Sequence, residues 1–170
     1  MTKEKPMLSF ELLKNCSVCA KLGEHHKEPT GPISSSIMLL VTAPVAAAVE
    51  DPINFLLDEA GIDSESVYQT TLIKCECRTE ITQEYVTNCV DRWLKLELRQ
   101  CNPSVLVVFG ELVFKVITKG KYGDFKHGKI VDTGSRKILC IMHPMYAVTG
   151  KLEEFMQAAK PLKELKDGSS

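Results

Sequence analysis

Apolar runs and amphipathic stretches alternate along most of the chain. Short, nearly continuous apolar runs, which are typical of buried strands, cover residues 37–41, 67–75, 104–110 and 137–143. Apolar residues at helical spacing cover residues 52–62, 82–101, 111–118 and 152–165. Because strands and helices alternate, the pattern predicts an α/β fold with a mostly parallel sheet.

The helix over residues 52–62 carries its own boundary signals. Pro52 is expected at its first position and Gly61 just past its end. In α/β sheets, functional groups collect at the carboxyl ends of the strands. Here those ends are Val41–Pro44, Leu72–Cys75, Phe109–Glu111 and Met142–Tyr146.

Composition indicates one ordinary globular domain. The chain has 170 residues, of which 44% are hydrophobic and 25% charged, enough to bury a core. We predict a single domain over residues 1–170, with an ordered core over about 12–165 and a tail at 166–170. The sequence has no apparent secretory signal and no apolar stretch of the ~20 residues that span a bilayer, so we expect a cytoplasmic protein without membrane contact.

Charge narrows the possible partners. A net charge of −1 argues against a general electrostatic grip on DNA, which needs clustered Lys and Arg. A local basic face near the last strand end stays possible. Its candidate members are Lys119, Lys121, Lys126, Lys129, Arg136, Lys137 and Lys151.

Four of the seven cysteines suggest a single site. In a reducing compartment, metal or redox chemistry is favoured over a disulfide framework. Cys16 and Cys19 form a C-x2-C pair, Cys75 ends a strand, and Cys89 lies in the helix that follows. Thiolates from these three segments could converge on one ion, and a tetrathiolate site suits zinc or iron–sulfur.

The other cysteines leave alternatives open. Cys77 competes with Cys75 for the third ligand position, since only one residue separates them. Cys101 and Cys140 are typical of small buried hydrophobic residues. A chance C-x2-C spacing with no bound metal also stays open.

The order of the motifs resembles the family 4 uracil-DNA glycosylases, the iron–sulfur members of the uracil-DNA glycosylase superfamily; the related family 5 shares the cluster. The resemblance covers Cys16 to Phe155. It implies a three-layer α/β/α fold around a central, mostly parallel four-stranded sheet. The motifs that carry it are CSVC, TAP, DEAGI, VYQTTLIKC, CVDRWL, PSVLVVFG and MHPMY.

The resemblance also implies a cofactor. In that family, four cysteines hold a [4Fe-4S] cluster. The corresponding positions here are Cys16, Cys19, Cys75 and Cys89. Zinc is the alternative that the residues alone allow.

The first catalytic motif of the family, Gly-Glu-x-Pro-Gly, is altered in this chain. Val41 and Thr42 stand where Gly and Glu are expected, and Val45 replaces the second Gly. Pro44 is retained and is a candidate substrate contact.

Two acids follow this motif and are candidate catalytic residues. Glu50 and Asp51 could supply the missing carboxylate, although acidic residues are also favoured at a helix N-terminus. The family's Gly-rich stretch, whose Phe stacks on uracil, has no counterpart before Pro52. Phe55 could substitute, but its helical spacing predicts a core position.

Two further positions concern base recognition. Thr71 stands where the family has an Asn that reads the uracil edge, and a hydroxyl cannot present a bidentate amide. His143 heads a segment that resembles the family's His-Pro-Ser-x loop, with Met145 in place of Ser. The resemblance implies that His143 stabilises the uracil anion and that Tyr146 belongs to a wedge that enters the minor groove.

Three hypotheses follow. The favoured one is a glycosylase-like iron–sulfur scaffold with lost or weakened excision, acting as a DNA-binding or protein-binding accessory in replication or repair. The alternative is an active glycosylase for uracil or another damaged base, using His143 with Glu50 or Asp51. A third is a cluster or zinc protein with a redox or structural role and no nucleic acid.

Overall fold

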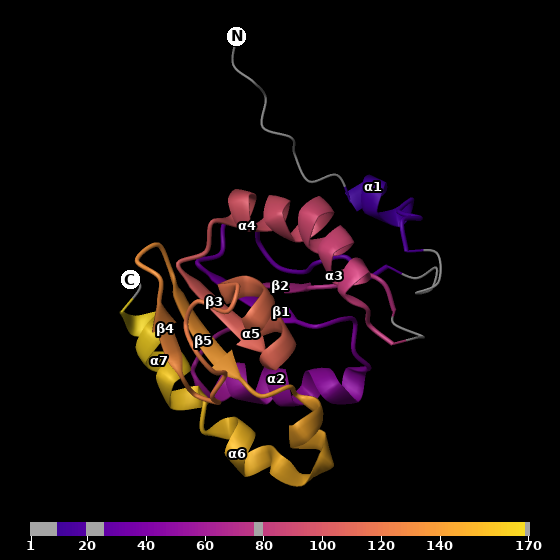
Figure 1. Ribbon diagram of the computed structural model, residues 1–170. Coiled ribbons are helices and arrows are strands. Elements are labelled where there is room, and N and C mark those ends of the chain that lie inside the picture. Colours follow the sequence, from indigo (N-terminus) through magenta and orange to yellow (C-terminus); the bar gives the residue numbers. More distant parts are fainter. Residues whose placement is uncertain (1–9, 20–25, 77–79, 169–170) are drawn as a thin grey trace.

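A twisted sheet forms the centre of the protein (Figure 1). The computed structural model describes residues 10–19, 26–76 and 80–168. Within them the sheet has five strands in the order β2-β1-β3-β5-β4. Their bounds are β1 Ile37–Val41, β2 Tyr68–Thr71, β3 Val105–Phe109, β4 Ile130–Asp132 and β5 Lys137–Ile141.

Four of these strands are parallel, as predicted, and the fifth is an addition. β4 pairs antiparallel with β5, Val131 facing Ile138. The sequence did not predict β4 because it has three residues, of which only Val131 is buried. The α/β class with a mostly parallel sheet is therefore confirmed, with one more strand than expected.

Helices cover both faces of the sheet. In Figure 1, α3 and α4 lie above the strands and α2 and α6 below them. The α-helices are α1 Phe10–Lys14, α2 Ala47–Glu59, α3 Gln83–Cys89, α4 Lys95–Cys101, α5 Glu111–Thr118, α6 Leu152–Met156 and α7 Ala159–Asp167. Shorter helical segments are η1 Ser64–Ser66, η2 Val90–Leu94 and η3 Ala147–Lys151.

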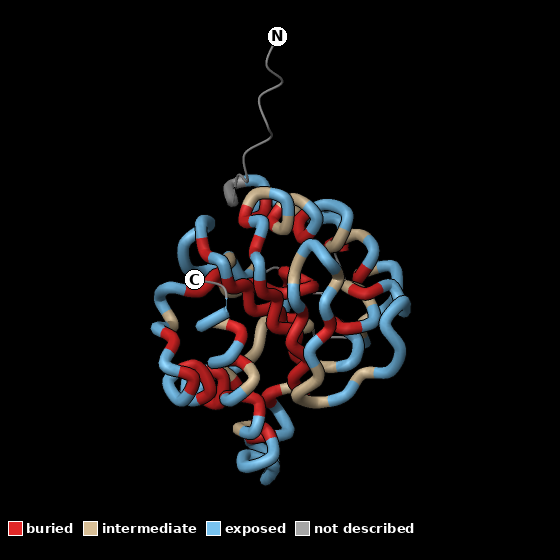
Figure 2. The backbone as a smooth tube through the Cα atoms, turned by 90° about the vertical axis from the view of Figure 1, so that its left-hand side faces the viewer, coloured by how far each residue is buried: buried red, intermediate tan, exposed pale blue. Residues whose placement is uncertain are grey.

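The strands are apolar throughout because both of their faces are buried. Leu106 and Val108 of β3 pack with the α3, α4 and α5 side, whereas Val107 and Phe109 pack with the α2 and α7 side. Figure 2 shows this as buried central strands enclosed by exposed outer turns. The expected three-layer α/β/α arrangement is confirmed.

Two predicted helix boundaries differ. α2 begins at Ala47, so Pro52 lies inside the helix and the predicted start at Pro52 is wrong. Alanine has the highest helix propensity, and three alanines precede Val49. The predicted helix over residues 82–101 is interrupted by the π-helical turn η2, which places Trp93 and Leu94 in the core.

The second strand is shorter than predicted. β2 ends at Thr71, and the chain from Leu72 to Cys75 stays buried outside the regular ladder. Cys75 forms an isolated bridge with His26, and Gln69 forms one with Thr30. The segment from His26 to Thr30 therefore lies along the outer edge of β2. No helix in the described part of the chain is long and apolar enough to cross a membrane.

Candidate functional site

The four candidate cluster cysteines line one small cavity. Cys16 and Cys19 follow α1, Cys75 follows β2, and Cys89 ends α3. The volume of this thiol cavity is about 10 Å³, roughly the space of one water molecule. The other described residues around it are Leu13, Val18, Lys74, Asn88, Arg92 and Trp93.

The chemistry of these side chains fits a sulfur-ligated metal group. The described cysteines form no disulfide, and burial raises the pKa of the Cys19 and Cys89 thiols. Within the described residues, no group of three or more His, Cys, Asp or Glu side chains is spaced to hold a metal ion. Ligation would require the thiols to lose their protons and draw together.

Other candidates near this cavity are placed as follows. The Cys75 Sγ lies 3.3 Å from the Nδ1 of His26. Cys77, the rival third ligand, lies outside the described residues. Cys101 and Cys140 are buried in the core, as predicted, and burial raises the pKa of each to about 11.

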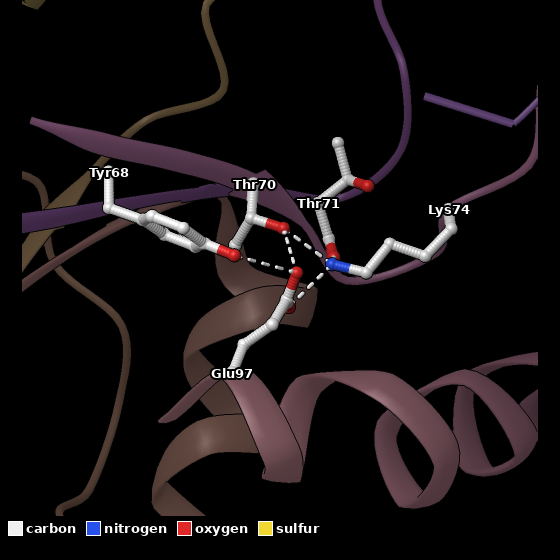
Figure 3. A network of polar contacts seen from close by, with 5 residues as sticks. All are labelled: Tyr68, Thr70, Thr71, Lys74 and Glu97. Atoms are coloured by element: carbon white, nitrogen blue, oxygen red, sulfur yellow. Dashed lines mark hydrogen bonds and ion pairs between the residues drawn. The ribbon is translucent and has the colours of Figure 1, made fainter. Parts of the chain in front are cut away.

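A buried polar network lies beside the thiol cavity (Figure 3). The Lys74 Nζ donates to the Glu97 Oε2 at 2.6 Å, to the Thr71 carbonyl oxygen at 2.7 Å and to the Thr70 Oγ1 at 2.5 Å. The Glu97 Oε1 accepts from the Thr70 hydroxyl at 2.9 Å and from the Tyr68 hydroxyl at 3.3 Å. Lys74 is 1% exposed and Glu97 0%, so both charges depend on these contacts.

The network fixes the chain between two sites. Burial lowers the pKa of Lys74, and the Glu97 carboxylate opposes that shift. Burial, with the same carboxylate, raises the pKa of Tyr68. Lys74 anchors the segment that carries Thr71 toward one cavity and Cys75 toward the other.

A larger cavity opens at the carboxyl edge of the sheet. Its volume is about 300 Å³, and it lies between the ends of β1 and β2 and the first turns of α2. Ligands of α/β proteins bind outside the carboxyl ends of the strands, and this cavity adjoins the ends of β1 and of the edge strand β2. The described residues around this carboxyl-edge cavity are Lys27, Glu28, Thr30, Val41, Val45, Glu50, Ile53, Asn54, Gln69, Thr70 and Thr71.

Two of the predicted site residues line the carboxyl-edge cavity. Glu50, in the first turn of α2, forms an ion pair with Lys27. The Thr71 hydroxyl is buried and has no hydrogen-bond partner among the described residues. In Figure 3 the Thr71 side chain points away from Lys74, while its carbonyl faces the network. An unpaired buried hydroxyl is uncommon and is usually met by a ligand or water.

Three other predicted residues lie elsewhere. Asp51 is exposed on α2, and Pro44 follows β1; neither is among the described residues that line the carboxyl-edge cavity. Phe55 is 59% exposed and borders a different groove with Leu152 and Met156. The predicted core position of Phe55 is therefore wrong, because it lies on the outward face of α2.

His143 follows β5, two strands from β1. At the usual strand spacing this is a separation of roughly 10 Å, and His143 is not among the described residues around the carboxyl-edge cavity. Its Nδ1 accepts the Met145 N–H at 3.2 Å, and burial lowers its pKa. Because the Nδ1 accepts this hydrogen bond, the ring proton lies on Nε2, and the lowered pKa favours the neutral imidazole.

The segment after His143 presents apolar side chains to solvent. Met145 is 46% exposed, Tyr146 52% and Val148 47%. The Lys151 Nζ lies 5.7 Å from the centre of the Tyr146 ring. We call residues 145–148, which run into η3 and in which Ala147 is buried, the exposed loop.

The predicted basic face around His143 is wrong for three of its seven members. Of the seven, Lys151 lies by the exposed loop. Lys119, Lys121 and Arg136 line a cavity at the opposite, amino edge of the sheet. The reason is topological, since the end of α5 and the β4–β5 turn lie at the strand starts.

Comparison with known proteins settles the family. The model of the Uracil DNA glycosylase superfamily matches residues 29–166. The chain belongs to this superfamily. It is also 32% identical over 98 residues to the type-5 uracil-DNA glycosylase of Pyrobaculum aerophilum, covering 54% of this chain and 43% of that protein. The match thus spans less than half of the relative's length.

The superfamily assignment agrees with the observed fold. Placement in family 4 stays a prediction, because the relative found is a type-5 enzyme. The sequence analysis missed the Lys74–Glu97 pair. The feature that could have revealed this pair is the position of Glu97 on the apolar face of the predicted helix that carries Trp93 and Leu94. A charge on such a face needs a buried partner.

Proposed function

We propose that this superfamily member binds DNA at the carboxyl edge of its sheet and has lost, or greatly weakened, base excision. It would act as an accessory in DNA replication or repair. One observation carries the proposal: the acid and the histidine that excision would need are not assembled. Glu50 is held by Lys27 in the carboxyl-edge cavity, and His143 lies outside that cavity.

Excision needs a flipped base whose leaving charge is stabilised at the moment of cleavage. The Lys27 ammonium already compensates the Glu50 carboxylate. Thr71 offers one hydroxyl to a base edge. These groups can contact a small polar ligand, but they do not form a paired acid and anion stabiliser.

The exposed loop supports DNA binding. Met145, Tyr146 and Val148 keep much of their surface in water next to the strand end that carries His143. Apolar side chains on such a loop can enter between base steps from the minor groove. The Nε2–H of neutral His143 is available as a donor beside them.

The proposal includes a [4Fe-4S] cluster held by Cys16, Cys19, Cys75 and Cys89, with zinc as the alternative. The support is the donor set, four sulfurs from three segments around one cavity. A bound cluster would tie the residues after α1 to the ends of β2 and α3.

Fluorescence anisotropy with labelled single- and double-stranded oligonucleotides containing uracil tests the proposal. Tyr146→Ala should weaken binding about tenfold, since base stacking on an aromatic ring contributes roughly 1–3 kcal/mol. Phe55→Ala, equally exposed on α2, should leave binding unchanged.

The protein should not excise uracil from the same oligonucleotides. Rapid excision that His143→Ala abolishes would establish an active glycosylase instead. Absence of DNA binding in the metal-loaded wild type would leave a redox or structural protein.

A further inference from the structure

A cationic cavity lies at the amino edge of the sheet, away from the exposed loop and from the thiol cavity. It has a volume of about 390 Å³ and lies between the end of α5 and the turn that joins β4 to β5. Leu106 and Ile138, near the starts of β3 and β5, contribute to its apolar wall. Lys119, Lys121 and Arg136 contribute its charges.

The charges of this amino-edge cavity are unbalanced. None of the described residues that line it carries a carboxylate. In the described parts of the chain, Lys119, Lys121 and Arg136 take part in no ion pair, whereas other lysines, such as Lys95 and Lys115, do. With a net charge of −1 for the whole chain, this is a local concentration of positive charge.

The backbone is fixed where two of these cations are attached. Lys119 adopts a left-handed conformation, φ 53°, at the end of α5. The Thr133 hydroxyl donates to the Arg136 carbonyl at 2.8 Å and accepts the Arg136 N–H at 3.2 Å, which closes the β4–β5 turn. The fold therefore fixes the backbone positions from which these two charged side chains extend.

An aromatic ring stands among the cations. Tyr122 lines the same cavity and is 36% exposed. Cations that follow a phosphate backbone, with an aromatic ring on which a base stacks, are the combination by which proteins hold single strands. Free phosphate would use the cations alone.

We propose that the amino-edge cavity binds a single-stranded nucleic acid. Lys119, Lys121 and Arg136 contact its phosphates, and one base stacks on Tyr122. This goes beyond the DNA contact proposed for the exposed loop, because the two lie at opposite edges of the sheet and neither requires the other.

The test uses the full chain and three probes: a labelled 20-nucleotide oligothymidine, an abasic oligomer of the same length, and sodium tripolyphosphate as competitor. Lys121→Ala/Arg136→Ala should weaken the binding of both oligomers about tenfold. The slope of log K against the logarithm of the salt concentration should become shallower by roughly one or more, because each lost phosphate contact lowers it by about that amount. Tyr122→Ala should weaken the binding of oligothymidine about fivefold, because base stacking on the ring is lost, and should leave the binding of the abasic oligomer unchanged.

Lys160→Ala/Lys163→Ala on α7 is the matched control, since it removes the same charge from an exposed helix elsewhere. Equal weakening by this control, or unchanged affinities in the cavity variants, would overturn the proposal. So would competition by tripolyphosphate together with no effect of Tyr122→Ala, which identifies a phosphate site without base contact. Repeating the series in protein that also carries Tyr146→Ala distinguishes binding at the amino-edge cavity from binding at the exposed loop.

Discussion

The two cavities at either end of the segment from Thr71 to Cys75 differ in how complete they are. The thiol cavity has a full set of soft donors from three segments. The carboxyl-edge cavity has an ion-paired glutamate, an unpaired hydroxyl and no histidine among its described lining residues. On our proposal, this difference would mean that a metal site can be kept while a neighbouring chemical site is weakened.

The Lys74–Glu97 network explains how the thiol cavity and the carboxyl-edge cavity can differ in this way. It fixes the Thr71 carbonyl and the chain before Cys75 through the contacts of Lys74 with Thr70, Thr71 and Glu97. Lining residues of the carboxyl-edge cavity that lie outside this network, such as Glu50, can therefore change without loss of the thiol arrangement. The following predictions probe this separation.

The largest expected effect is on cofactor loading. Cys89→Ser should lower bound iron and acid-labile sulfide, or zinc if that is the metal, to well under half of the wild-type content. The reason is that one of four ligands is lost and metal binding is coupled to local folding. Cys140→Ala, a buried thiol of β5 in the core, should load as the wild type does.

Elemental analysis of the anaerobically purified proteins measures this. If Cys89→Ser and the wild type carried equal metal, the thiol cavity would not be the metal site.

The next effect is on stability. In the metal-free protein, Lys74→Met should lower the free energy of unfolding by about 3–5 kcal/mol, because it leaves the Glu97 charge buried without its partner. Lys115→Met removes one half of an exposed, solvent-screened ion pair and should leave the free energy of unfolding nearly unchanged. Urea unfolding compares the two; similar small losses would show that the network does not hold the end of β2.

The unpaired hydroxyl of Thr71 gives a smaller effect of opposite sign. Thr71→Val keeps the shape of the side chain and should stabilise the ligand-free protein by about 1 kcal/mol, since a buried unpaired polar group is removed. Thr70→Val should destabilise it by about 1–3 kcal/mol, because Lys74 and Glu97 lose a partner. Equal losses in both variants would mean that the Thr71 hydroxyl is satisfied in solution.

A pH effect of smaller size comes from His127. Its Nδ1 accepts the Met142 N–H at 3.0 Å, its Nε2 lies 2.8 Å from the Glu154 carbonyl, and burial lowers its pKa below 6.5. The unfolded chain then binds protons more readily, so stability is lost as pH falls below about 6.5. Urea unfolding between pH 8 and pH 5 should show a shallower loss in His127→Gln; an unchanged slope would exclude His127 as the cause.

The fold could be predicted best from the sequence where buried residues form a clear apolar run or a helical period. The parallel strands appeared as continuous apolar runs, as in Val105–Phe109. β4 was invisible, because a three-residue edge strand with one buried side chain has no period to detect.

Within the site, motif order located the cysteines and His143 but not the relations between side chains. Lys27 and Glu50 are 23 positions apart, and nothing in the local pattern pairs them. The basic residues were close in sequence to His143, yet the β4–β5 turn carries Arg136 to the other edge of the sheet. Such placement is set by tertiary packing and is not a property of the segment.

The most direct test is single-turnover uracil excision by the metal-loaded protein in excess over a labelled single-stranded oligonucleotide. Our account predicts that the wild type releases uracil no faster than His143→Ala, while both bind the oligonucleotide. Rapid release by the wild type that His143→Ala abolishes would contradict it. That result would show that His143 reaches the carboxyl-edge cavity when DNA is bound.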